Sequence, residues 1–290
     1  MYRGRLAPTP TGLLHLGHAR TFWTAQQRAR EQGGILFYRN EDLDPARCKP
    51  EFHEAAIEDL RWLGLEWQGE PISQSTRLTH YRRAFERLRD TGHLFPCTCS
   101  RKDIRNAAIA PHTEDGEAIY PGTCRTKYSS AQPHEPSTPA NWRFRVTKGE
   151  VVEFEDGRCG PQHFVAGKNF GDFPVWQKDG MPAYQLAVVV DDAAMGITEV
   201  VRGADLLTST ARQLLLYTAL GLTPPAYYHC ELMRDENGQR LSKRHDALSL
   251  RSLRTKEKRP KNCDRSGPSH SLHWPIHGPE QCRQEDWSTR

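Results

Sequence analysis

The chain has 290 residues, of which 37% are hydrophobic, and 40 Lys and Arg residues against 36 Asp and Glu residues give it a formal net charge of +4. This length can bury a sizeable core and favours one large domain with an insertion. The small positive charge permits a polyanionic partner without requiring one. No apolar run approaches the roughly 18 residues of a membrane span, and the start lacks the pattern of a signal peptide, so we expect a cytoplasmic protein without membrane contact.

The first part of the chain alternates between strand and helix patterns. A strand-to-turn pattern at residues 5–12 leads into a helical, apolar-periodic stretch at 16–30, and a β-rich run at 35–39 precedes a second helix at 50–63. A third helix is expected at about 78–91. Alternation of this kind predicts a parallel α/β sheet.

The sequence of about residues 93–141 indicates an insertion in the domain. Much of this segment is rich in Pro, Gly and charged residues and shows little periodicity, so something other than a hydrophobic core must hold it. Three of the eight cysteines gather here, at Cys97, Cys99 and Cys124. This clustering favours a metal site in a reducing compartment over a disulfide framework.

Strand patterns return after the insertion. Residues 142–156 alternate like the strands of a small antiparallel element, which 164–175 continue. Two apolar runs, 184–190 and 197–202, then predict buried strands of the resumed parallel sheet.

A helix is expected at residues 209–220, with Thr208 or Ser209 as its N-cap. After about Arg254 the composition changes, because residues 255–290 hold few large apolar side chains and show no period. We therefore expect one domain at 1–254 and a disordered, atypical tail at 255–290.

Two short motifs far apart in the chain carry cationic side chains. The first, His15-Leu16-Gly17-His18, opens the first predicted helix, where backbone N–H groups and the positive helix end can hold a phosphate. The second spans residues 240–244 and contains Lys243, a compact positive charge that can cover a leaving group. The first motif is weak evidence alone, since two histidines at a helix start are more often surface caps. The second motif and the pattern between them favour an ATP site.

Six ordered blocks carry a family resemblance. They resemble the glutamyl branch of class I aminoacyl-tRNA synthetases, and within it the short glutamyl-Q tRNA(Asp) synthetase family. The resemblance covers about residues 3–254 and implies a Rossmann-like parallel-sheet catalytic domain of α/β class, with a zinc-containing insertion and no anticodon-binding domain. The blocks lie at residues 5–12, 15–18, 39–45, 184–192, 201–206 and 240–243.

The resemblance implies a ligase that forms an aminoacyl adenylate. It would activate L-glutamate with ATP, accompanied by Mg²⁺, and transfer it to the queuosine base of tRNA(Asp), bound by its anticodon arm. His15, His18 and Lys243 would be catalytic, and these three with Gly17 would bind ATP. Such chemistry needs positioning and electrostatic stabilisation, and no nucleophilic side chain.

The same resemblance implies a glutamate pocket. Arginines can form bidentate pairs with the two carboxylates of glutamate, and Glu41 can accept from its ammonium group. Arg202 ends one predicted strand and Glu41 follows another, and ligands bind at the carboxyl ends of strands in open α/β sheets. The pocket residues would be Arg5, Ala7, Thr9, Glu41, Tyr184 and Arg202.

The cysteine segment resembles the family's zinc site. Cys97, Cys99 and Cys124 would supply three thiolates, and Tyr120 a fourth ligand through its oxygen, which can complete a closed tetrahedral Zn²⁺ site of structural type. His112 lies in the spacer and is an alternative to Tyr120 as the fourth ligand.

Three alternatives to the glutamyl-Q activity stay open. A truncated glutamyl-tRNA synthetase would charge the 3′ end of tRNA, and a non-catalytic paralogue would only bind tRNA or glutamate. A pantothenate-synthetase-like ligase would share the first motif but would not need the zinc insertion. The oligomeric state is not fixed by the sequence, and we expect a monomer.

Overall fold

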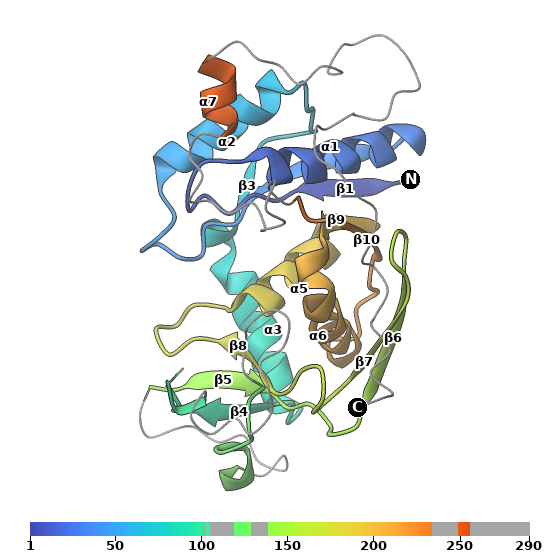
Figure 1. The fold of residues 1–290 in the computed structure, drawn as a ribbon. Helices are drawn as coiled ribbons and strands as arrows, with labels where there is room; N and C mark the ends of the chain where they lie inside the picture. Colours follow the sequence, from blue (N-terminus) through green and yellow to red (C-terminus); the bar gives the residue numbers. More distant parts are fainter. Residues whose placement is uncertain (101, 105–118, 129–138, 234–248, 256–290) are drawn as a thin grey trace.

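The computed structural model describes residues 1–100, 102–104, 119–128, 139–233 and 249–255 (Figure 1). Its N-terminal part alternates strands and helices around a parallel sheet of order β1-β2-β3. The helices expected near 16–30, 50–63 and 78–91 are all confirmed. The elements are β1 (Arg3–Leu6), α1 (Leu16–Glu31), β2 (Ile35–Asn40), α2 (Pro50–Trp62), β3 (Ile72–Ser73), a 3₁₀ turn (Gln74–Arg77) and α3 (Leu78–Asp90).

A second group of strands has the order β7-β6-β10-β9. Strands β9 and β10 pair in parallel, as do β10 and β6, while β7 is antiparallel to β6. The Thr198 backbone N–H, just before β9, donates to the Arg3 carbonyl at 2.8 Å, so β1 lies beside β9. The elements are β6 (Val151–Asp156), β7 (Gly160–Val165), β9 (Glu199–Gly203), α6 (Leu207–Ala219) and β10 (Ala226–Cys230).

The position of β1 makes it a topological switch point. The chain leaves β1 through α1 to β2 on one side, whereas β9 lies on its other side. Adjacent connections that diverge in this way open a crevice at the carboxyl ends of the two strands, where ligands bind in open α/β sheets. The predicted α/β class with a parallel sheet is thus confirmed.

The strands expected to form one small antiparallel element are divided between two sheets. Strand β5 (Asn141–Phe144) pairs antiparallel with β4 (Leu94–Cys97) and with β8 (Phe173–Trp176). Strands β6 and β7 form an antiparallel hairpin, but β6 also pairs with β10 and so extends the larger sheet. Alternation reveals strands but not their partners, which tertiary packing selects.

The strand predicted at 184–190 is wrong, because this segment is helix α5 (Tyr184–Ala194). Its three consecutive valines favour strand locally, but the helix packs against α3, α6 and β8, with Leu186, Ala187 and Val189 fully buried. Burial around most of the helix overrides the weak backbone preference of β-branched residues. The second predicted strand, at 197–202, is confirmed as β9.

Helix α6 begins earlier than predicted. Its N-cap is Leu206, without a side-chain cap hydrogen bond, so neither Thr208 nor Ser209 is the cap. A 3₁₀ turn over Ala204–Leu206 leads directly into the helix. The Ser209 hydroxyl instead accepts from Gln185 Nε2 at 3.0 Å, which ties α6 to α5.

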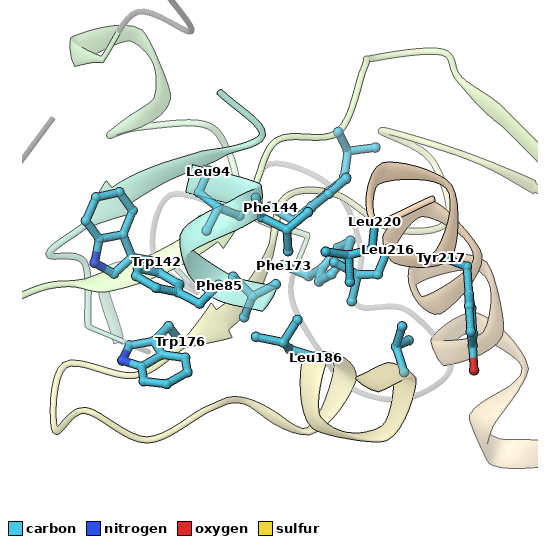
Figure 2. Packing of buried hydrophobic residues seen from close by; sticks show 14 of the residues in the cluster. Phe85, Leu94, Trp142, Phe144, Phe173, Trp176, Leu186, Leu216, Tyr217 and Leu220 are labelled. Carbon is cyan, nitrogen blue, oxygen red and sulfur yellow. The ribbon is translucent and has the colours of Figure 1, made fainter. Parts of the chain in front are cut away.

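The largest hydrophobic cluster lies where α3, α5 and α6 meet the antiparallel strands (Figure 2). Phe85 of α3 packs edge-on against Trp142 of β5, with ring centroids 5.4 Å apart, so Trp142 is a packing residue. A second cluster joins β1, α1 and β2 to Leu250. Among the described residues, no helix combines the length and hydropathy needed to cross a membrane.

Helix α7 (Leu250–Thr255) returns to the N-terminal half and packs beside α2 (Figure 1). Arg254 Nη2 donates to Glu58 Oε2 at 2.7 Å, and Arg254 Nε lies 3.4 Å from Asp59 Oδ1. Thr255, placed by prediction in the tail, is the last residue of this helix. The rest of the predicted tail, 256–290, lies outside the described residues.

Asp59 is fully buried, and neither carboxylate oxygen accepts a hydrogen bond from the described residues. Burial raises its pKa to about 6, although Arg254 opposes the shift. The folded state therefore holds a proton that the unfolded chain releases, and this stabilisation is lost as pH rises through about 6. As pH rises from 4.5 to 7, the free energy of unfolding of Asp59→Asn should gain about 2 kcal/mol relative to wild type, as measured by urea unfolding. If the free energy of unfolding depends on pH in the same way in both proteins, this prediction is wrong.

Candidate active site

A cavity of about 420 Å³ opens at the carboxyl ends of β1 and β9, at the topological switch point. Its walls come from the turn after β1, the first turns of α1, Glu41 after β2, the start of α5 and the segments after β9 and β10. The cavity brings together nine residues singled out in the sequence, namely Arg5, Ala7, Thr9, His15, Gly17, His18, Glu41, Tyr184 and Arg202.

Arg202 is held on three sides by uncharged acceptors. Its Nε donates to His229 Nε2 at 3.2 Å, its Nη1 to Gln213 Oε1 at 2.9 Å and its Nη2 to Thr210 Oγ1 at 2.6 Å. A guanidinium carries five N–H groups, so these three bonds leave one N–H on each Nη. None of the three partners is a carboxylate, and the cation therefore keeps its charge available to an anionic ligand.

Arg5 and Glu41 are held by a buried ion network behind the cavity. Arg5 Nη1 donates to the Val201 carbonyl at 3.0 Å, and its Nε lies 3.4 Å from Asp192 Oδ1. The fully buried Arg39 bridges Asp192 at 2.5 Å and Glu41 Oε1 at 2.9 Å. Desolvation alone would lower the pKa of Arg39, but these carboxylates raise it well above its usual value. The network holds both cavity side chains in place from behind.

Two histidines cap helix α1. The His15 ring accepts from the Gly17 backbone N–H at 3.1 Å, and the His18 ring accepts from the His15 backbone N–H at 3.2 Å, each through Nδ1. The ring centroids are 3.8 Å apart. A ring that accepts through Nδ1 carries its proton on Nε2 when neutral. The caps thus set both rings to the same tautomer at a helix N-terminus, where anions bind.

Gly17 leaves room for this cap. A Cβ atom at position 17 would stand 2.9 Å from His15 Cε1, closer than side chains approach one another. Any larger residue would push the His15 ring away from the Gly17 N–H. Glycine between the two histidines therefore lets the His15 ring keep its capping position.

The predicted catalytic Lys243 lies outside the described residues, as does the whole motif at 240–244. The described residues on either side of that segment are both close to the cavity. Met233 lines it, and the Leu250 backbone N–H donates to the Leu14 carbonyl at 2.8 Å, next to a β-bridge between Ser249 and His15. The role of Lys243 stays a prediction.

The sequence did not single out several cavity or supporting residues. Asp205 and Glu231 line the cavity, and Glu231 follows directly after β10, so the rule that placed Glu41 would have found it. Arg39 and Asp192 lie within the blocks 39–45 and 184–192, but their residue types alone do not distinguish supporting ion pairs from surface charge. No sequence pattern indicated a functional role for His229, because it lies inside the short strand β10.

The three clustered cysteines form a group that could hold a metal ion. The sulfur atoms of Cys97, Cys99 and Cys124 all lie within 4.8 Å of one another. The Tyr120 hydroxyl is 3.5 Å from Cys97 Sγ and accepts from the Cys124 backbone N–H at 2.7 Å. Three thiolates and a phenol oxygen suit tetrahedral Zn²⁺. The alternative fourth ligand, His112, lies outside the described residues.

The surroundings of the cysteines contain little other core. Their hydrophobic cluster comprises only Phe95, the cysteines, Tyr120, Ile104 and Tyr128 among the described residues. Arg143 of β5 stacks over the Tyr120 ring at 4.3 Å and anchors it to the antiparallel sheet. So small a cluster agrees with an insertion whose folding energy comes from a bound metal.

Residues 1–263 match the family described as tRNA synthetases class I (E and Q), catalytic domain. The chain belongs to this family. Two relatives named glutamyl-Q tRNA(Asp) synthetase are close in sequence. That from Nitratidesulfovibrio vulgaris is 49% identical over 265 residues, covering 88% of this chain and 81% of the relative. That from Symbiobacterium thermophilum is 48% identical over 267 residues, with the same coverage.

Other members of the family are longer. A glutamate–tRNA ligase from Aquifex aeolicus is 40% identical over 253 residues, which cover 86% of this chain and 53% of the ligase. A solved glutamate tRNA ligase from Elizabethkingia meningosepticum, in complex with its amino acid, superposes with a TM-score of 0.68 at 27% identity. It covers 84% of this chain, which spans about half the length of that ligase.

Proposed function

We propose that this protein activates L-glutamate with ATP and transfers the glutamyl group to the queuosine base of tRNA(Asp). The observation that carries the proposal is the cavity, which combines two arginines, a fixed glutamate side chain and a histidine-capped helix start in a chain of this family. The near relatives named glutamyl-Q tRNA(Asp) synthetase support the acceptor. The reaction suits a cytoplasmic monomer that meets tRNA through its anticodon arm.

In the first step, a carboxylate oxygen of glutamate attacks the α-phosphorus of ATP, and pyrophosphate leaves. Arg5 and Arg202 pair with the glutamate carboxylates, while Glu41, Thr9 and Tyr184 surround the ammonium group, with Ala7 leaving space beside it. His15 and His18 donate from Nε2 to phosphate oxygens of ATP, which Mg²⁺ accompanies. Lys243 stabilises the charge that develops on the leaving group.

In the second step, a hydroxyl group of the queuosine base attacks the activated carbonyl. An ester forms and AMP leaves as the mixed anhydride breaks. The Rossmann-like domain has to bind the anticodon arm itself, since the proposed acceptor lies there.

Two measurements test the function. Exchange of pyrophosphate into ATP should depend on glutamate and on no other amino acid in a full panel. Labelled glutamate should then appear on tRNA(Asp) that contains queuosine and not on the same tRNA lacking it, with the label in the anticodon fragment after nuclease digestion. Label on the 3′-terminal adenosine would instead show a truncated glutamyl-tRNA synthetase, and absence of exchange would show a binding paralogue.

For the cysteine group, the proposal is structural Zn²⁺ bound by Cys97, Cys99, Cys124 and Tyr120. When bound, the ion would cross-link the start of the insertion, at Cys97 and Cys99, to its middle, at Tyr120 and Cys124. Cys97→Ser and Cys124→Ser should each lose the zinc found in wild type and slow transfer to tRNA more than glutamate-dependent exchange, because the cavity lies apart from the insertion. Metal analysis is the measurement, and Cys48→Ser is the matched control that should keep the metal. Freshly purified wild type without zinc would refute the site.

A further inference from the structure

The guanidinium of Arg202 is the end of a buried chain of hydrogen bonds across three neighbouring strands. Asp156 of β6 contacts His229 of β10, with 2.6 Å between Oδ2 and Nδ1, and His229 Nε2 lies 3.2 Å from Arg202 Nε of β9. The Asp156 carboxylate and the His229 ring are fully buried, and Arg202 is 4% exposed where it lines the cavity.

Asp156 is held as a carboxylate. Burial favours its neutral form, but hydrogen bonds from the His229 ring and from backbone N–H groups outweigh burial and lower its pKa. The Cys159 backbone N–H donates to Oδ1 at 2.8 Å, and the His229 backbone N–H donates to Oδ2 at 3.1 Å. An ionised carboxylate only accepts, so the proton between Asp156 and His229 belongs to His229 Nδ1.

The second ring nitrogen of His229 is therefore an acceptor. Burial next to Arg202 lowers the pKa of His229 to about 4, so the ring is neutral at physiological pH. With the proton on Nδ1, Nε2 presents a lone pair to the Arg202 Nε–H. The opposite tautomer would set two N–H groups against each other at this 3.2 Å contact. Asp156 thus selects the one tautomer that can hold Arg202.

Helix α6 provides the other hydrogen-bond partners of the Arg202 guanidinium. Thr210 Oγ1 accepts from Arg202 Nη2 and lies 3.0 Å from His229 Nε2, while Gln213 accepts from Nη1. Gln213 Nε2 donates in turn to Gln185 Oε1 of α5 at 2.9 Å. These bonds fix the guanidinium through Nε and both Nη atoms, and the described residues provide no acceptor for the second N–H of each Nη, beside the cavity that Arg202 lines.

We propose that His229 is a positioning residue for amino-acid recognition: fixed as its Nδ1–H tautomer by Asp156, it orients Arg202 so that both Nη atoms pair with one carboxylate of the ligand. This inference rests on the proposed function, because it takes the ligand of Arg202 to be glutamate. His229 itself touches no substrate and acts through Arg202.

Two substitutions separate the donor and acceptor roles of His229. In His229→Asn the amide nitrogen can replace Nδ1 toward Asp156, but no atom replaces Nε2. In His229→Gln the amide oxygen reaches the Nε2 position and again accepts from Arg202. We expect His229→Asn to raise KM for glutamate about tenfold, with kcat and KM for ATP near wild type, and His229→Gln to recover most of the loss. His163→Asn, an exposed histidine on β7 of the same sheet, is the matched control and should change nothing.

A double-mutant cycle with Arg202→Ala identifies the route of the effect. If His229 acts through Arg202, adding His229→Asn to Arg202→Ala raises KM no further. If Arg202→Ala raises KM but His229→Asn does not, the positioning role is overturned while the proposed pocket stands. If Arg202→Ala itself leaves glutamate dependence unchanged, the proposed pocket fails.

A measurement on the wild-type protein covers the case in which His229→Asn does not fold. Long-range ¹H–¹⁵N NMR correlations distinguish the two neutral imidazole tautomers and the imidazolium. Assigned signals of His229 at pH 7 should show a proton on Nδ1 and none on Nε2. A proton on Nε2, in either the neutral or the charged ring, would overturn the inference.

Discussion

Replacing Arg202 with alanine is expected to raise KM for glutamate about a hundredfold in pyrophosphate exchange, while KM for ATP stays near the wild-type value. The reason is desolvation: the substrate carboxylate would enter the cavity without its bidentate partner, and loss of one partner of a buried charge pair costs about 3 kcal/mol. The KM of Arg202→Lys for glutamate should lie between those of wild type and Arg202→Ala, since lysine keeps the charge but cannot make the paired hydrogen bonds of a planar guanidinium.

Arg28→Ala is the matched control for this change. Arg28 of α1 forms two hydrogen bonds of 2.7 Å to Glu199, which lies on the same strand as Arg202 but away from the cavity. Its loss should lower stability and leave KM for glutamate unchanged. Equal effects of Arg28→Ala and Arg202→Ala on KM would mean that the glutamate pocket has been placed wrongly.

Lys243→Ala is expected to slow glutamate-dependent exchange about a hundredfold at saturating ATP and glutamate, with little change in KM for glutamate. The ammonium group should act on charge that develops in the transition state and is absent from the bound amino acid, and one such electrostatic contact contributes about 3 kcal/mol. This expectation comes from the motif in the sequence and from the two described flanks of its segment, which lie at the cavity.

The exposed Lys178, in the turn after β8, provides the comparison for Lys243. Lys178→Ala removes an equal charge and should leave the exchange rate unchanged. An unaltered rate in Lys243→Ala under the same conditions would remove the motif at 240–244 from the proposed catalytic machinery.

The N-terminal half of the fold was predictable because local signals there agree with one another. Helix α1 begins at the histidine motif, and α2 has proline at its first position. The positions of Glu41 and Arg202 followed from a general rule about the carboxyl ends of parallel strands. These two residues could therefore be expected in one crevice before any contact was known, although their roles remain predictions.

Helix α5 and the middle strands were not predictable in the same way. The apolar run 184–190 is buried as a helix among three other elements, and a short buried run has the same pattern in a strand or a helix. Strand β6 pairs with β10, about seventy positions away, so local alternation could not name its partner. His229 and Asp156 meet only through that pairing, which explains why neither attracted notice in the sequence.

The residues that contact one another around the cavity lie far apart in the sequence, and this affects the order in which the domain can fold. The Tyr2 hydroxyl donates to Glu199 at 2.9 Å, and the Thr198 N–H donates to the Arg3 carbonyl, so β1 acquires its second neighbour, β9, only after most of the domain has been synthesised. The cysteine cluster, in contrast, closes over a short local segment, and local contacts form faster than distant ones. A nascent chain that ends near residue 190 already carries every ligand of the metal group but lacks Arg202. Affinity for glutamate should therefore appear late in synthesis, and ligand binding should report the completed domain.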